Sequence, residues 1–375
     1  MFERFREWEE NRHQYAKDWK ERTGGKILGY FCSYLPEEII YAADVLPVRI
    51  FGSHEAPDDT EPHIFGMFCP FCRDCLSQGL KGRYDYLDAI AGTNTCIHIN
   101  QSFESWSMHI PVSHSLFFNM PNTVQTERAR PYLAGEMAEF KRSVEEWTGR
   151  TITDKGLDRT IDLLNTNRRL MKQIYELRKG DPPSLSGVEA MEMVLSSQLT
   201  HKEEHNQELE RVLKELPERN TKKEAGARLM IVGSEDDDIE FLEMVESLDA
   251  TFVIDDHCTG SRYFWNEVIP DDNRLKAIAN RYLDRPPCPS KDWPRRSRVP
   301  HILNLAKEYR VQGAVLMQQK FCDPHEADIP TLKTQLEKNG IPTYFLEFDV
   351  TVPIGQFKIR IEAFLEMLRA EELPF

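Results

Sequence analysis

The chain lacks the features that a membrane protein or a nucleic-acid-binding protein needs. It contains no run of 18 apolar residues, and residues 1–8 are too charged to form the apolar core of a signal peptide. Positive charge is also in deficit, because 47 Lys and Arg residues face 62 Asp and Glu residues, which gives a formal net charge of −15. This sign disfavours nucleic acid and anionic membranes as partners. We therefore expect a soluble, cytoplasmic chain that binds neither.

Two glycine signatures of nucleotide binding are also missing. The sequence has no G-x-x-x-x-G-K-S/T phosphate loop and no G-x-G-x-x-G fingerprint, and the Gly24-Gly25 pair has no flanking match. If the reaction consumes ATP, we expect another protein to bind the nucleotide.

Apolar segments of strand length alternate with helical segments in both halves of the 375-residue chain. The pattern predicts an α/β fold with two Rossmann-like parallel-sheet domains that face a cleft and a helical segment between them. We expect domains at residues 1–130, 131–220 (helical) and 221–375. The expected strands are 26–31, 47–51, 84–91, 115–119, 228–233, 251–255, 313–317 and 343–348. The main expected helices between them are 36–44, 70–82, 237–248 and 331–339.

Three cysteines stand where these expected elements begin or end. Cys96 follows the third strand of the first half, Cys322 follows the third strand of the second half, and Cys69 opens helix 70–82. Open α/β sheets bind ligands outside the carboxyl ends of their strands, so two facing domains would bring Cys96 and Cys322 to a shared cleft. At a helix N-terminus, Cys69 would favour the thiolate form. Three thiolates suit a [4Fe–4S] cluster with one open iron.

The cysteine spacing leaves other interpretations open. Cys69, Cys72 and Cys75 form a C-x2-C-x2-C run, which could hold a cluster locally or bind zinc together with His63 or His98. An isolated cysteine in an α/β core is more often a small buried hydrophobic residue. We assign three cysteines to that class: Cys32, Cys258 and Cys288.

Longer motifs add a resemblance that covers nearly the whole chain. The segments are GYFCSYLPEEIIYAA at 29–43, CPFCR at 69–73, GLKG at 79–82, YDYLD at 84–88, TC at 95–96, GSEDDD at 233–238, DDHCTGSR at 255–262, RYL at 281–283, PC at 287–288, FCDP at 321–324 and RIEAFLE at 360–366. Together they resemble the 2-hydroxyacyl-CoA dehydratase and benzoyl-CoA reductase family. The chain length and the cysteine run look most like the smaller cluster-bearing subunit of ATP-dependent benzoyl-CoA reductase.

The resemblance implies a ligand set and a cofactor. It gives Cys69, Cys96 and Cys322 as the ligands of one [4Fe–4S] cluster, with Cys72 and Cys75 as neighbours. Ile97 stands where an Asp is common in the family.

The resemblance also implies a reaction and partners. The reaction is ferredoxin-dependent reduction of the aromatic ring of benzoyl-CoA, and the alternative is dehydration of an (R)-2-hydroxyacyl-CoA. The implied partners are a larger homologous cluster-bearing subunit, two ATPase subunits, ferredoxin as electron donor and the acyl-CoA substrate.

Two further polar segments have two interpretations each. Ser33 occupies a position that lies near the substrate in the family, or it caps helix 36–44. His257, which follows Asp255 and Asp256 at a strand end, could transfer protons, or the segment could anchor a loop. We expect residues 236–238 to form a solvated helix N-terminus.

Overall fold

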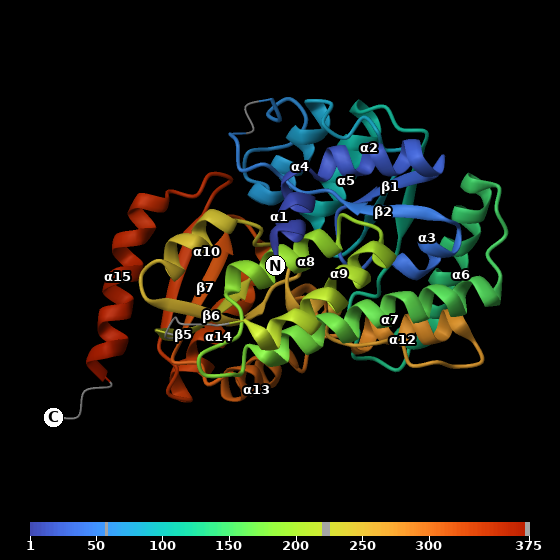
Figure 1. The fold of residues 1–375 in the computed structure, drawn as a ribbon. Helices are drawn as coiled ribbons and strands as arrows, with labels where there is room; N and C mark the ends of the chain where they lie inside the picture. The colour runs from blue at the N-terminus through green and yellow to red at the C-terminus, as the bar shows by residue number, and fades with distance from the viewer. Residues whose placement is uncertain (57–58, 220–225, 372–375) are drawn as a thin grey trace.

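Two four-stranded parallel sheets organise the computed structural model, which describes residues 1–56, 59–219 and 226–371 (Figure 1). The strand orders are β2-β1-β3-β4 and β6-β5-β7-β8, so both halves share one topology. The strands are β1 Lys26–Tyr30, β2 Val45–Arg49, β3 Ala89–Thr93, β4 His114–Phe118, β5 Ala227–Gly233, β6 Ala250–Asp256, β7 Gly313–Gln319 and β8 Thr343–Phe348. The expected α/β class with two parallel sheets is confirmed.

One edge strand of each sheet is less buried than the other three strands. Every residue of the inner strands β3 and β7 and of the edge strands β2 and β6 is buried, whereas the opposite edge strands, β4 and β8, include exposed residues. The start of β3 was expected too early, at residue 84. The segment before β3 is instead a turn in which the Tyr84 hydroxyl hydrogen-bonds both to the Phe51 amide (2.9 Å) and to the Phe51 carbonyl oxygen (3.1 Å).

Helices cover the sheets and fill the middle of the chain. They are α1 Glu3–Glu10, α2 Arg12–Thr23, α3 Glu37–Ala42, α4 Pro70–Leu80, α5 Ile97–His109, α6 Ala129–Thr148, α7 Asp154–Leu177, α8 Gly187–Ser197, α9 Lys202–Glu215, α10 Ile239–Glu246, α11 Ser261–Phe264, α12 Arg274–Asp284, α13 Arg298–Glu308, α14 Asp323–Lys338 and α15 Ile354–Glu371, with short 3-10 helices η1 Leu216–Glu218 and η2 Pro289–Lys291. The middle segment is helical, as expected. The boundary expected at residues 220/221 lies outside the described residues.

Helices of both halves pack on the helical middle of the chain. Helix α12, from the second half, lies along α6 and α7, and α1 packs on α8 (Figure 1). A single cluster of buried apolar side chains includes residues of both sheets. The two halves therefore share one core.

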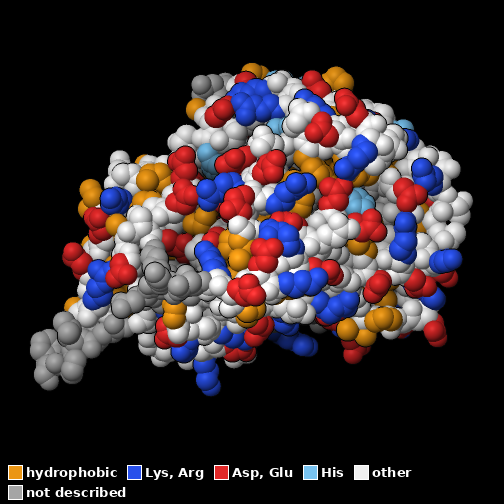
Figure 2. All heavy atoms as spheres, in the orientation of Figure 1, with side chains coloured by type: hydrophobic (Ala, Val, Ile, Leu, Met, Phe, Trp, Pro, Cys, Tyr) orange, Lys and Arg blue, Asp and Glu red, His pale blue; other side chains and the backbone are white. Residues whose placement is uncertain are grey.

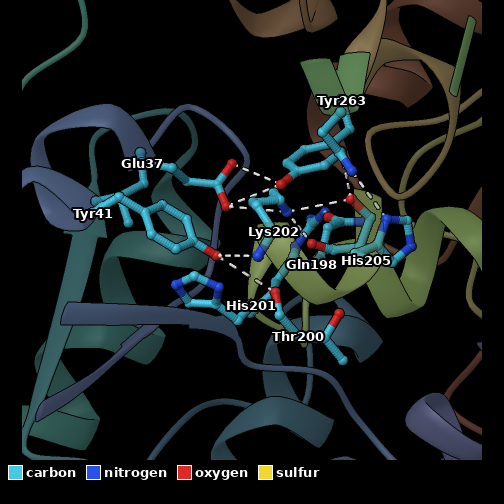
Figure 3. Close-up of polar contacts among 12 residues, drawn as sticks. Glu37, Tyr41, Gln198, Thr200, His201, Lys202, His205 and Tyr263 are labelled. Carbon is cyan, nitrogen blue, oxygen red and sulfur yellow. Dashed lines mark hydrogen bonds and ion pairs between the residues drawn. The ribbon is translucent and has the colours of Figure 1, made fainter. Parts of the chain in front are cut away.

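A buried polar network also joins the halves (Figure 3). The Tyr263 hydroxyl on α11 contacts both carboxylate oxygens of Glu37 on α3, at 2.9 and 2.7 Å. The Nζ atom of Lys202, at the start of α9, lies 3.8 Å from the same carboxylate. Side chains from the first half, the helical middle and the second half thus meet at one buried carboxylate.

Acidic and basic side chains are interspersed over the face shown in Figure 2. Among the described residues, no helix is long and apolar enough to cross a membrane.

Candidate functional site

Loops at the carboxyl ends of β1, β3, β5, β6 and β7 enclose one cavity between the two sheets. This is the edge at which open α/β sheets bind their ligands. Seven of the eight cysteines of the chain line it: Cys32, Cys69, Cys72, Cys96, Cys258, Cys288 and Cys322. The three cysteines singled out from the sequence are therefore brought together.

Those three cysteines share a structural position, because each is the N-cap residue of a helix. Cys69 precedes α4, Cys96 precedes α5 and Cys322 precedes α14. The Cys96 sulfur accepts a hydrogen bond from the Ile99 amide at 3.4 Å. Three helix N-termini therefore point their partial positive charge at one cavity, which favours thiolate ligands there.

The thiols are protonated when no metal binds them. Contact with Cys69, together with burial, raises the pKa of Cys322 well above its usual range. Burial raises the pKa of Cys96 in the same way. Because only the thiolate is a good metal ligand, metal binding at this cavity must release protons.

Gln319, at the end of β7, ties the cysteine loop of the first half to the second half. Its Oε1 atom accepts hydrogen bonds from the Phe71 amide at 2.7 Å and from the Cys69 thiol at 3.7 Å. Its Nε2 atom donates to the carbonyl oxygen of Glu235 at 3.0 Å. Gln319 thus fixes the position of Cys69 relative to both sheets.

The C-x2-C-x2-C run does not converge on one point. Cys72 lines the cavity, but the fully buried Cys75 thiol points to the Ile50 carbonyl oxygen at 3.4 Å. His63 packs against His109, away from the cavity. The Nδ1 atom of His98 accepts a hydrogen bond from the Cys69 amide at 3.0 Å. Among the described residues, no three His, Cys, Asp or Glu side chains are placed to hold a single metal ion. The zinc interpretation therefore has no geometric support.

The donor set fits a [4Fe–4S] cluster better than one ion. A cluster takes thiolates spread around a cavity, whereas zinc draws its ligands to within about 2.3 Å of a single centre. Sulfur atoms at three helix N-termini around one apolar cavity match the first requirement.

Ser33 lines the cavity and does not cap a helix. The N-cap residue of α3 is Pro36, and no side chain caps that helix. The Ser33 hydroxyl and carbonyl oxygens instead accept hydrogen bonds from Arg285, at 3.1 and 2.7 Å. The capping interpretation of Ser33 is thereby wrong.

Glu235 is the carboxylate among the cavity-lining residues, and its charge is balanced. Arg49, at the end of β2, forms an ion pair with its Oε2 atom at 2.8 Å. The Cys258 thiol lies 2.7 Å from the same oxygen. Both residues of the ion pair are buried, so it links the first sheet to the loop that follows β5.

His257 is fully buried and does not line the cavity. Its Nδ1 atom lies 3.3 Å from the Ser234 carbonyl oxygen, and burial lowers the pKa of its imidazole to about 4. The two preceding residues anchor the loop. Asp255 accepts a hydrogen bond from the Tyr175 hydroxyl at 2.6 Å, and Asp256 forms an ion pair with Arg298. The loop-anchoring interpretation fits these contacts.

The acidic segment 236–238 is not solvated, contrary to expectation. Asp236 and Asp238 are buried at 1% and 7% exposure. The Asp238 carboxylate caps α10, because it accepts a hydrogen bond from the Phe241 amide at 2.8 Å. The sequence pattern located the helix start, but it did not show that this start packs against the first half.

Several cavity residues were missed by reasoning from the sequence. Cys32, Cys258 and Cys288 line the cavity, although we assigned them to the ordinary core. Arg262 and Arg285 line it as buried cations. The available signal was their position in or beside the longer motifs: Cys32 in segment 29–43, Cys258 and Arg262 in segment 255–262, Cys288 in the PC motif and Arg285 between the RYL and PC motifs.

Comparison with known proteins matches the chain to one family model and to subunits of several acyl-CoA enzymes. The family model for the 2-hydroxyglutaryl-CoA dehydratase D-component matches residues 32–368. The chain is 26% identical over 370 residues to the (R)-phenyllactyl-CoA dehydratase beta subunit of Clostridium sporogenes, covering 98% of each chain. It is 25% identical over 350 residues to one of the subunits of benzoyl-CoA reductase from Thauera aromatica, covering 92% of this chain and 90% of the relative. It is 24% identical over 355 residues to the (R)-2-hydroxyglutaryl-CoA dehydratase beta subunit of Acidaminococcus fermentans, covering 92% and 93%.

Proposed function

The chain belongs to the 2-hydroxyglutaryl-CoA dehydratase D-component family, and from that premise we propose that it is the iron–sulfur subunit of a multi-subunit acyl-CoA enzyme. The family bears iron–sulfur clusters, and the relatives named above are subunits. In this proposal Cys69, Cys96 and Cys322 hold one [4Fe–4S] cluster. The observation that carries it is the convergence of three N-cap cysteines on one cavity.

The residues of the chain provide the surroundings that this chemistry needs. When bound, a [4Fe–4S] cluster supplies single electrons at low potential. Gln319 holds Cys69 in place, and the Arg49–Glu235 ion pair fixes the loop opposite. Arg285 holds Ser33 at the cavity wall, where its hydroxyl is our candidate for a substrate contact. Most of the side chains that line the cavity are buried, which limits the access of water to the site. His257 has no contact with the cavity, so we give it no proton-transfer role.

Ring reduction of benzoyl-CoA is the first candidate reaction. It consumes two electrons, supplied by ferredoxin, and two protons, and it yields a cyclic diene thioester. The cysteine-run motif at residues 69–75 and the length of the chain support this candidate. ATP hydrolysis would drive the electrons uphill on separate subunits, since this sequence has no phosphate loop.

Dehydration of an (R)-2-hydroxyacyl-CoA is the second candidate. The observation that favours it is the set of dehydratase beta subunits among the relatives, at 24–26% identity, level with the reductase subunit at 25%.

Cysteine variants test the cluster assignment. We expect Cys69→Ser, Cys96→Ser and Cys322→Ser to lower the iron and acid-labile sulfide content of anaerobically purified protein to a small fraction of wild type. Cys75→Ser is the matched control, because its thiol lies beside the Ile50 carbonyl oxygen and not in the cavity. Loss of iron from Cys72→Ser and Cys75→Ser, with full iron in Cys322→Ser, would show that the local run holds the metal. Zinc in place of iron would overturn the proposal.

A further inference from the structure

Two buried cations beside the cavity have no carboxylate partner among the described residues. Arg285 and Lys291 are each 2% exposed. Arg285 donates only to the carbonyl and hydroxyl oxygens of Ser33, and Lys291 donates to the Asn94 carbonyl oxygen at 3.0 Å. In the described part of the chain, no Asp or Glu oxygen lies within 4.0 Å of either positive group.

Several other buried cations of this chain have a carboxylate partner, whereas Arg285 and Lys291, like Arg228 and Arg281, donate only to uncharged oxygens. Arg49 has Glu235, Arg168 has Glu38 at 2.7 Å, and Arg262 has Asp256 at 3.7 Å. A buried charge without a counter-charge is costly, and proteins avoid it unless an ion or ligand supplies the opposite sign. What distinguishes Arg285 from Arg228 and Arg281 is its position, because it lines the cysteine cavity, where an anion would supply its counter-charge.

The placement of both cations points to the cysteine cavity. They flank Cys288 in the segment 285–291, which follows α12 and contains three prolines. Arg285 lines the cavity directly. Burial lowers the pKa of Lys291, and the nearby cysteines Cys288, Cys32 and Cys96 act against this in their thiolate form. The Cys288 amide donates to the Tyr34 hydroxyl at 3.1 Å, which holds the segment against the first half.

We propose that Arg285 and Lys291 are the counter-ions of the cluster held in this cavity and that they raise its reduction potential. The inference rests on the proposed function, because the cluster is the anion. Three thiolates give a [4Fe–4S] cluster a net negative charge, and that charge grows by one on reduction. A nearby fixed cation therefore stabilises the reduced state more than the oxidised state. Both residues act through the cluster as positioning and tuning groups and need not touch the substrate.

The test is a dye-mediated redox titration of the reconstituted full chain, followed by the EPR signal of the reduced cluster. We expect Arg285→Gln and Lys291→Met, which remove charge, to shift the midpoint potential to more negative values. Arg285→Lys and Lys291→Arg, which keep the charge, should stay near wild type. Circular dichroism checks that each variant is folded.

Arg228→Gln is the matched control. Arg228 is also buried and donates only to carbonyl oxygens, but it lies at the start of β5, about 17 Å from the end that faces the cavity. Its potential should equal that of wild type.

The outcomes separate this inference from the proposed function. A wild-type chain that binds no cluster overturns both. A cluster of unchanged potential in the charge-removing variants overturns this inference alone. If a folded Arg285→Gln variant loads no iron while Arg285→Lys loads fully, the counter-ion role is supported, and Lys291→Met still reports the potential.

Discussion

At the scale of single residues, one ion pair links the two halves beside the cavity loops. The Nε2 atom of His54, after β2, lies 3.2 Å from the Oδ1 atom of Asp237, before α10. Burial alone would lower the pKa of His54, but Asp237, helped by Asp238 and Asp74, raises it to about 10. His54 is therefore charged at neutral pH, and its attraction to the Asp237 carboxylate stabilises the contact between the two halves.

The pH dependence of stability should reveal this pair. Because the pKa of His54 is higher in the folded chain than its ordinary value of about 6.5, the stabilisation is complete below about pH 6.5. It is lost as the pH rises through about 10. We expect the free energy of unfolding in urea to fall between neutral pH and pH 10 by about 1–2 kcal/mol more in wild type than in His54→Gln.

An exposed histidine provides the control for that measurement. His114 lies on the edge strand β4 and is exposed, so His114→Gln should keep the wild-type slope of stability against pH. Parallel curves for wild type and His54→Gln would show that the pair contributes nothing.

The sequence predicted some site residues and missed others for a physical reason. Cys69, Cys96 and Cys322 could be placed at one sheet edge from local order, because each stands at a strand end or a helix start, and the family resemblance then favoured them over the local C-x2-C-x2-C run. Arg285 and Lys291 were missed because their burial results from packing against Ser33 and Asn94, which lie far away in sequence. The ligand roles of the three cysteines stay predictions until iron is measured.

At the scale of elements, short polar contacts between helices hold the halves in register. Glu37 on α3 is buried at 3% exposure and receives two hydrogen bonds from Tyr263 on α11 (Figure 3). Lys202 lies within ion-pair distance at 3.8 Å, but burial lowers its pKa to about 8. Tyr263 is therefore the closest donor to this carboxylate among the described side chains.

Removing the Tyr263 hydroxyl should destabilise the chain. A buried carboxylate that loses its donors bears a desolvation cost of about 1–3 kcal/mol. We expect Tyr263→Phe to lower the free energy of unfolding by that amount in urea titrations at pH 7. Tyr132→Phe on α6, where the side chain is 46% exposed, should unfold like wild type. A Tyr263→Phe variant as stable as wild type would mean that Lys202 compensates.

Helices and strands were predicted correctly where the local sequence pattern determines them. The predictions were wrong where tertiary contacts determine the element. All eight strands were located because buried parallel strands are short apolar runs bounded by turn residues. Helix α14 was expected only over residues 331–339, after Pro330, a residue that is unfavourable inside a helix. It begins at Asp323 instead and contains Pro330, because Cys322 and Pro324 provide a good helix start upstream. The first helices, α1 and α2, were not among the expected elements, and they pack on later elements, α1 on α8 and α2 on β1.

At the scale of the whole molecule, we propose that the chain is one subunit of a multi-subunit enzyme. Its relatives are named as beta subunits of dehydratases and as one of the subunits of a reductase. The shared core and the polar links between the halves make the two sheets one unit around the cavity. What the sequence lacks is a phosphate loop for ATP. The larger cluster-bearing subunit and the two ATPase subunits would supply the remaining functions.

Reconstitution should show this division of labour and also identify the reaction. We expect the isolated chain, given ATP and reduced ferredoxin, to convert neither benzoyl-CoA nor (R)-2-hydroxyacyl-CoA thioesters, because it has no ATP-binding loop to energise electrons. The complete complex should convert one of them and lose activity in air.

Product analysis by mass spectrometry distinguishes a diene thioester from an enoyl thioester. Free benzoate is the control substrate for ring reduction, because it lacks the thioester carbonyl that stabilises the first radical. Turnover by the isolated chain would overturn the assembly proposal. Dehydration without ring reduction would assign the chain to the dehydratases, since those recycle the injected electron whereas a reductase consumes electrons in each turnover.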